Sequence, residues 1–197
     1  MVAAAAAAAG WAALLSTCPP GCFLAAAPLC TAWLILSARA APPGLAARLR
    51  PRAADLLLAL ALALVLYAGA RAFLWAGCGG VTRALCGPVA GLLARFETRG
   101  VLPALVLAVL VAPAEELFWR GVVQETLAAR HGVAWGIAGT TALAVAASLA
   151  IGEPVLALAT VPTYAAWGIL GAWRRSLVAP IVSHAAWTLL VAVVARP

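Results

Sequence analysis

Two adjacent carboxylates stand inside a hydrophobic stretch that is long enough to cross a membrane. Glu115 and Glu116 follow the apolar run Val111–Ala114, and Arg120 comes one helical turn after Glu116. A charged side chain at the centre of a bilayer costs about 3 kcal/mol on insertion scales. A chain retains such groups where they pair, bind a ligand or carry out a reaction. This stretch is therefore the first candidate for a functional site.

The spacing of these three residues gives them different roles. Residues four apart on a helix lie on one face, so Glu116 and Arg120 can form an ion pair. Glu115 points about 100° away from Glu116 on a helix of 3.6 residues per turn. Arg120 can thus neutralise one carboxylate and leave the other to act as a general base. The alternative is an ion pair that only fixes helix packing, but packing needs only one carboxylate.

A histidine in the last apolar stretch is the second candidate. His184 is followed one turn later by Thr188, which can offer a hydroxyl on the same helix face. An intramembrane histidine is either a hydrogen-bonded core residue or a metal ligand and proton carrier, and both interpretations stay open. If His184 belongs to the site, it should lie within about 10 Å of the two carboxylates. Glu125 is expected near the membrane surface, paired with Arg130.

The composition is that of an integral membrane protein. The chain is 66% hydrophobic and 10% charged, with a mean hydropathy of +1.07, whereas a soluble domain is about half apolar and a quarter charged. We predict an all-α, polytopic bundle of membrane helices. The net charge of +7 comes from arginines, which cluster in the 38–52 loop and at Arg174–Arg175. This pattern indicates cytoplasmic loops and contact with membrane lipid, and no nucleic-acid partner.

About 20 apolar residues cross a bilayer, and the chain offers six or seven such stretches. They are 2–17 and 22–36 (two short spans or one broken helix), 53–75, 100–126, 133–151, 155–173 and 177–195. A loop with a short interfacial helix is expected over 76–99. We divide the chain into N-terminal membrane helices with a basic loop, 1–52, and a helical membrane core, 53–197. The five cysteines form no Cys-x-x-Cys pair and are interpreted as small apolar residues.

The polar residues of these spans resemble the motifs of the CPBP family of intramembrane proteases, also called the CAAX protease or Abi family. The first motif of the family, Glu-Glu-x-x-x-Arg, is complete in Glu115, Glu116 and Arg120. The third motif, His-x-x-x-Asn or Asp, is half present, because His184 matches and Thr188 stands at the Asn position.

The second motif of the family, Phe-x-x-x-His, is lost. Ser148 occupies the expected histidine position and Ala144 the phenylalanine position. The resemblance covers about residues 95–195. A serine lacks both the neutral-pH base and the metal-ligating nitrogen of an imidazole, so the departure bears directly on activity.

The resemblance implies an intramembrane metalloprotease in which Glu115 or Glu116 activates a water for attack on a peptide bond. His184 would help to hold that water or a metal, and Thr188 would stabilise the oxyanion in place of asparagine. A divalent metal such as zinc would be held by Glu116 and His184, although a site with one imidazole would bind it poorly. The site could therefore also lack a metal.

The implied substrate is a membrane-associated peptide or protein, either of CAAX type or a bacterial peptide. The implied location is the bacterial cytoplasmic membrane. The alternative function is that of a catalytically impaired pseudoprotease, which has the same fold and binds a membrane partner without cutting it. A transporter is disfavoured, since no pair of broken helices recurs in two halves of the chain.

Overall fold

A computed structural model describes residues 32, 34, 36, 39, 43–79, 86–96, 101–150 and 152–191. All regular structure within these ranges is helical, and they contain no strand. The predicted all-α fold is therefore confirmed. The two predicted N-terminal spans, 2–17 and 22–36, lie almost wholly outside the described residues.

The described helices follow the predicted spans closely. They are α3 (Leu45–Arg48), α4 (Ala53–Gly79), α5 (Cys86–Phe96), α6 (Val101–Val106), α7 (Ala112–Phe118), α8 (Glu125–His131), α9 (Val133–Ala150), α10 (Pro154–Arg174) and α11 (Val178–Leu189). By length and composition, three of them can cross a membrane, namely α4 over Ala53–Ala76, α9 and α10, whereas α11 is a shorter apolar helix. The protein is an integral membrane protein built as a helical bundle.

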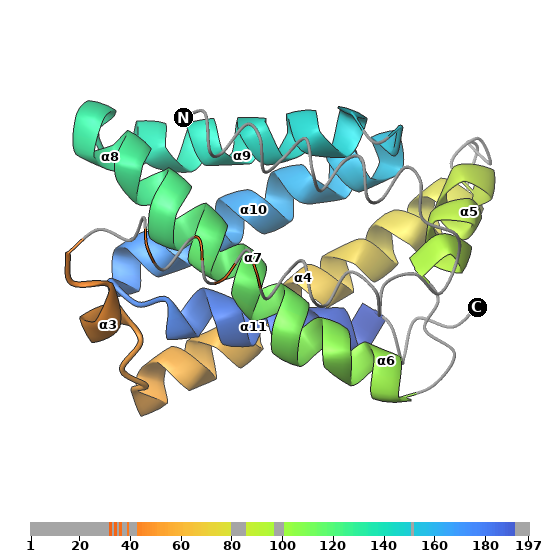
Figure 1. Ribbon diagram of the computed structural model, residues 1–197. Coiled ribbons are helices and arrows are strands. Elements are labelled where there is room, and N and C mark those ends of the chain that lie inside the picture. The colour runs from red at the N-terminus through yellow and green to blue at the C-terminus, as the bar shows by residue number, and fades with distance from the viewer. Residues whose placement is uncertain are drawn as a thin grey trace.

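Two π-helical segments turn α6, α7 and α8 into one continuous helical element. These segments are η2 (Leu107–Val111) and η3 (Trp119–Gln124). Helices α9 and α10 pack as one pair and α11 and α4 as another, and Figure 1 shows the element running diagonally across the bundle that they form. Helix α11 packs against both α4 and α7, while η3 and α8 pack against α9. The element that carries the carboxylates is therefore in contact with both helix pairs.

A proline explains the first π-helical segment. Pro113 lies in the first turn of α7, directly after η2. Proline cannot donate a backbone hydrogen bond, and its ring crowds the carbonyl four residues earlier, which here belongs to Val109 in the middle of η2. The wider π turn falls where that crowding arises. Wide turns of this kind occur mostly as single turns inside α-helices and often at functional sites.

The segments predicted to share the cytoplasmic side meet at one end of the bundle. The Leu177 N–H donates to the Arg48 carbonyl at 2.9 Å, which ties α3 to the start of α11. Arg174, at the end of α10, forms a 2.7 Å ion pair with Asp55 at the start of α4. Asp55 is fully buried, so this pair closes the end of the bundle.

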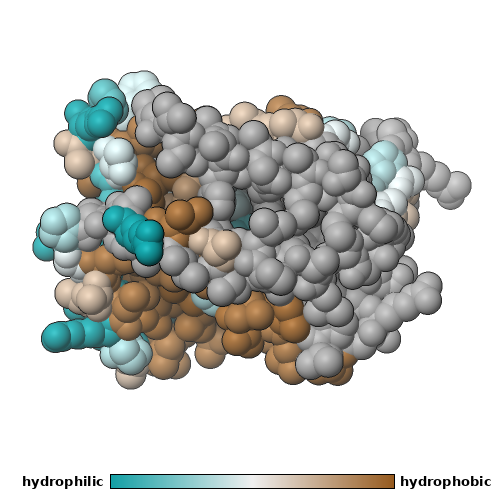
Figure 2. Space-filling view, viewed as in Figure 1, coloured by the Kyte–Doolittle hydropathy of each residue, from teal (hydrophilic) through white to brown (hydrophobic). Residues whose placement is uncertain are grey.

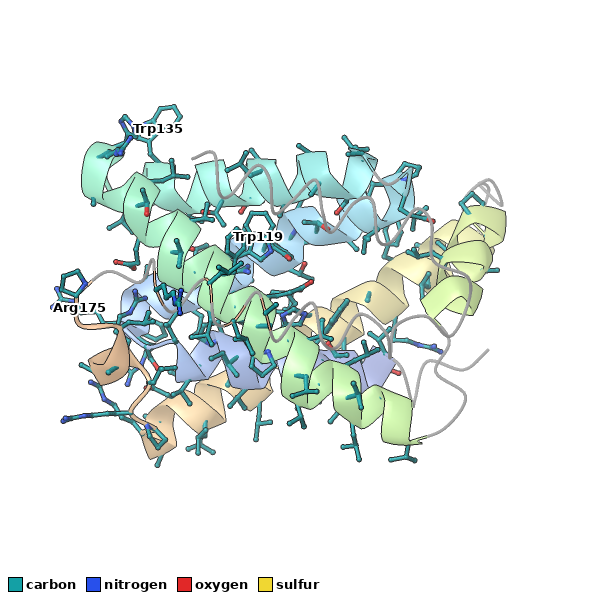
Figure 3. The ribbon with its side chains drawn as sticks, viewed as in Figure 1. Trp119, Trp135 and Arg175 are labelled. Carbon is teal, nitrogen blue, oxygen red and sulfur yellow. The ribbon has the colours of Figure 1, made fainter. Side chains whose placement is uncertain are left out.

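Hydrophilic residues gather at the same end, around α3 and α8, as Figure 2 shows. The exposed basic residues there are Arg50, Arg52, Arg130 and Arg175. Trp135 lies near the start of α9 with 70% of its surface exposed, and Figure 3 shows it pointing away from the bundle. Exposed tryptophans next to arginines are typical of a helix end at a membrane–water interface.

Two sequence predictions about individual residues are wrong. Glu125 pairs with Arg48 rather than with Arg130, because the basic loop folds back over the start of α8. Cys86 is disulfide-bonded and is not a free small apolar residue. Arg48 and Glu125 lie far apart in the sequence, and helix periodicity carries no signal for their pairing or for the oxidation of Cys86.

Gly136 allows α8 and α9 to pack closely, and its replacement should destabilise the fold. A Cβ at this position would lie 2.8 Å from the Ala128 Cβ and 2.8 Å from the Gln124 carbonyl oxygen. We expect Gly136→Ala to lower the free energy of unfolding by about 1–3 kcal/mol, the usual cost of overpacking. Denaturant-induced unfolding in detergent measures this change in the free energy of unfolding. Gly69→Ala is the matched control, because nothing lies within 4 Å of a Cβ there; equal effects of both changes would contradict the packing argument.

Candidate active site

Glu116 is the centre of a buried polar cluster that joins α7, η3 and α11. Its side chain is fully buried, and its Oε1 accepts a hydrogen bond of 3.1 Å from Arg120 Nη1. The same oxygen lies 2.9 Å from His184 Nδ1. The predicted pairing of Glu116 with Arg120 is confirmed, and so is the predicted convergence of the two carboxylates with His184. The roles of these residues in a reaction stay predictions.

Arg120 and the glutamine one turn later fasten this element to α10. Arg120 Nη2 donates to the Tyr164 carbonyl at 3.0 Å, and its guanidinium lies 4.2 Å from the centre of the Tyr164 ring. Gln124 Nε2 donates to the Gly168 carbonyl at 3.1 Å. A side chain at position 168 would collide with Gln124, since a Cβ there would lie 2.9 Å from Gln124 Oε1. These two hydrogen bonds, from Arg120 to Tyr164 and from Gln124 to Gly168, form a ladder between the helices. The ladder fixes the position of the site along the axis of α10.

Glu115 is the freer of the two carboxylates. Its side chain is 21% exposed, and its Oε2 lies 3.8 Å from His184 Nε2. The Tyr164 hydroxyl donates to the same oxygen over a long 3.5 Å contact. The Arg120 guanidinium donates to Glu116 and to the Tyr164 carbonyl. The Glu115 carboxylate therefore stays accessible and only weakly hydrogen-bonded. This division of roles is the one that the sequence spacing predicted.

The imidazole of His184 is held at both its edge and its face. An ionised carboxylate only accepts hydrogen bonds, so Nδ1 is the donor in the contact with an ionised Glu116, and Nε2 is the ring nitrogen on the side of Glu115. The ring stacks on Trp167, with centroids 4.1 Å apart and planes 20° apart. The bond and the stack together hold the ring with Nε2 facing Glu115.

The two remaining residues, Thr188 and Ser148, are placed on α11 and α9. Thr188 is on α11 one turn after His184 and is partly buried. Ser148 is buried on α9, where its hydroxyl donates to the Ala144 carbonyl at 3.0 Å and lies 3.2 Å from Thr160 Oγ1. Thr160 is one turn before Tyr164 on α10, so Ser148 is next to the turn that leads into the site.

Sequence reasoning missed the aromatic residues of α10. Tyr164 and Trp167 supply the wall of the site, and Trp119 of η3 lies edge-on to Tyr164 with ring centroids 5.9 Å apart. Figure 3 shows Trp119 inside the bundle rather than on its surface. An available signal was that Tyr164 and Trp167 stand three residues apart and therefore on one face of a predicted span.

The donor set does not fit the divalent metal that the resemblance implies. Zinc sites use at least three protein ligands, and the described part of the chain holds no group of three His, Cys, Asp or Glu side chains placed to bind an ion. His184 Nδ1 is already bonded to Glu116, and by the family resemblance Ser148 takes the place of the second imidazole. The described residues of the site therefore do not supply the ligands that a zinc ion needs.

Fold and site together define a helical membrane protein whose buried cluster unites two carboxylates, a guanidinium and an imidazole. Residues 96–190 match the family model of type II CAAX prenyl endopeptidase Rce1-like proteins. This match supports the membership in the CAAX protease family that the resemblance predicted, and the family is one of proteases. The matched segment contains every member of the cluster. No curated protein and no solved structure matched the chain.

Proposed function

We propose that the protein is an intramembrane endopeptidase in which Glu115 activates a water molecule against a peptide bond. One observation carries the proposal most directly. The accessible Glu115 carboxylate faces His184 Nε2 at 3.8 Å, while Glu116 holds the opposite nitrogen of the same ring. A carboxylate oxygen and an imidazole nitrogen thus converge on one point from two different helices.

A water at that point can donate one hydrogen to Glu115 and the other to His184 Nε2, which directs its lone pair outward. As the water oxygen bonds to the scissile carbonyl carbon, Glu115 takes the proton. The carbonyl oxygen becomes an oxyanion, for which the Thr188 hydroxyl is the proposed donor. When the C–N bond breaks, the proton passes from Glu115 to the leaving amine, so the carboxylate is restored.

Glu116 and Arg120 have a supporting role in this proposal. Glu116 fixes the tautomer and the orientation of His184, as a carboxylate does for the imidazole of a catalytic triad. Arg120 balances the charge of Glu116, so that the negative charge left in the site is that of Glu115. The proposal uses no metal.

Glu115→Gln should abolish most of the activity. The amide has nearly the same shape but cannot take a proton, and general-base catalysis contributes about 10²- to 10⁴-fold. We expect that loss in the rate of cleavage of membrane-tethered CAAX-type and bacterial peptides by the purified full chain. Glu125→Gln is the matched control, since Glu125 pairs with Arg48 at the end of the bundle. Cleavage that survives Glu115→Gln unchanged, or that a chelator stops, would refute the mechanism.

The proposed partners are membrane lipid and a membrane-associated peptide or protein, in a bacterial cytoplasmic membrane. The apolar helices and the protease family support a membrane substrate. The arginine-rich end of the bundle supports a cytoplasmic orientation of that end. If the wild-type chain binds such peptides in vesicles but does not cut any of them, the pseudoprotease alternative replaces the protease.

A further inference from the structure

One tryptophan contacts two consecutive residues of α11. Trp167 of α10 is 1% exposed, and its face stacks on the His184 ring at 4.1 Å. Its Nε1–H donates to Ser183 Oγ at 3.1 Å. The same indole therefore holds the catalytic imidazole by its face and the preceding residue by its edge.

The indole is itself held from several directions. A buried tryptophan needs a partner for its N–H, and Ser183, which is fully buried, supplies it. Tyr164 and Trp187 lie against the Trp167 ring, with centroids 6.0 Å and 5.8 Å away. The indole plane is thus fixed by one hydrogen bond and two aromatic neighbours.

The stack of Trp167 on His184 restrains a rotation of the imidazole that the hydrogen bond to Glu116 does not prevent. A single hydrogen bond at Nδ1 fixes one corner of the imidazole but permits the ring to rotate about the line from Nδ1 to Glu116 Oε1. Such a rotation would carry Nε2 away from Glu115, which lies 3.8 Å from it. A flat surface 20° from parallel to the ring opposes that rotation.

We infer that Trp167 is a positioning residue, which keeps His184 Nε2 directed at Glu115 and uses Ser183 as its anchor. The inference rests on the proposed function, because it assigns Trp167 a purpose in the same site. A ring that only fills the core would still need a partner for its N–H, but it would not need to lie parallel to the imidazole of His184.

Histidine NMR tests the inference without any assay of activity. The chain has two histidines, so His131→Gln leaves His184 as the only imidazole, and the labelled full chain is observed in detergent micelles. Stacking on an indole shifts the ring protons of His184 upfield. We expect Trp167→Leu to remove that shift and Trp167→Phe to keep part of it. An unchanged His184 spectrum in folded Trp167→Phe and Trp167→Leu would overturn the inference.

A double-mutant cycle tests the anchor. Ser183→Ala should move the His184 signal in the Trp167 background, since it leaves the indole N–H unpaired. It should move the signal little in the Trp167→Phe background, where no N–H is present. Equal effects in both backgrounds would overturn the role of Ser183.

Kinetics separate positioning from simple packing. We expect Trp167→Phe to lower kcat about tenfold or more with little change in KM, because small misplacement of a catalytic group is costly. A rise in KM alone would contradict positioning. If the wild-type chain cleaves nothing, the proposed function fails, whereas the NMR result still decides whether Trp167 orients His184.

Discussion

Replacing Arg120 by alanine will lower the free energy of unfolding by about 3–5 kcal/mol, the cost of leaving one partner of a buried ion pair uncompensated. Arg120 and Glu116 are both fully buried and bond at 3.1 Å. The change also removes the hydrogen bond to the Tyr164 carbonyl and the contact with the Tyr164 ring. The measurement is equilibrium unfolding in one detergent, compared with wild type and with Glu115→Ala.

Glu115→Ala is the matched comparison for Arg120→Ala, because Glu115 is partly exposed and makes only a long hydrogen bond. Its effect should be the smaller of the two. Glu116→Gln combined with Arg120→Ala should recover part of the loss, since no charge is then left unpaired. Arg120→Lys should not restore full stability, because an ammonium lacks the planar fork that reaches Glu116 and Tyr164 together. An Arg120→Ala protein as stable as wild type would contradict the argument.

Ser148→His should raise the rate of peptide cleavage, by up to about 10²- to 10⁴-fold if the imidazole acts as an acid or base. The CAAX protease family resemblance places its second-motif histidine at this position. The structure puts Ser148 beside Thr160, one turn before the tyrosine that bonds Glu115. Cleavage of a membrane-tethered peptide library by wild type and variant gives the comparison.

Ser148→Asn is the control for the gain, because asparagine is similar in size to histidine but is not a base. A larger side chain at this buried position risks overpacking, so the unfolding transition of each variant is measured beside its activity. Adding Glu115→Gln to Ser148→His should remove the gain. Wild-type cleavage that is robust and indifferent to Ser148→His would show that the position has another role.

The helix bundle and one ion pair of the site could be predicted from local sequence pattern. Long apolar runs gave α9 and α10 nearly residue by residue, since each run ends at a glycine, proline or arginine. The pair Glu116–Arg120 follows from spacing within one helix. The approach of His184 to Glu116, 68 residues away in the chain, was predicted because polar groups in a membrane have few alternatives to each other.

Local pattern could not supply the features that depend on packing between helices. A period of 3.6 residues does not encode the π turns at η2 and η3, although Pro113 stands directly after the first of them. In the sequence, Trp167 is one of many apolar residues of a span, and its contacts with His184 and Ser183 depend on how α11 packs against α10. Glu125 could pair with several arginines by sequence, and only the path of the 43–52 loop selects Arg48.

The ladder from Arg120 and Gln124 to the carbonyls of α10 limits how the bundle can open for a substrate. The two donors are one turn apart on their helix, and the two acceptors, at Tyr164 and Gly168, are one turn apart on theirs. Sliding one helix along the other would break both bonds together, so shear is disfavoured. Hinge motion of α11 and α4 away from this rigid pair leaves both bonds intact. Admission of a peptide should therefore swing His184 away from Glu115, and closure of the hinge should complete the site around the bound chain.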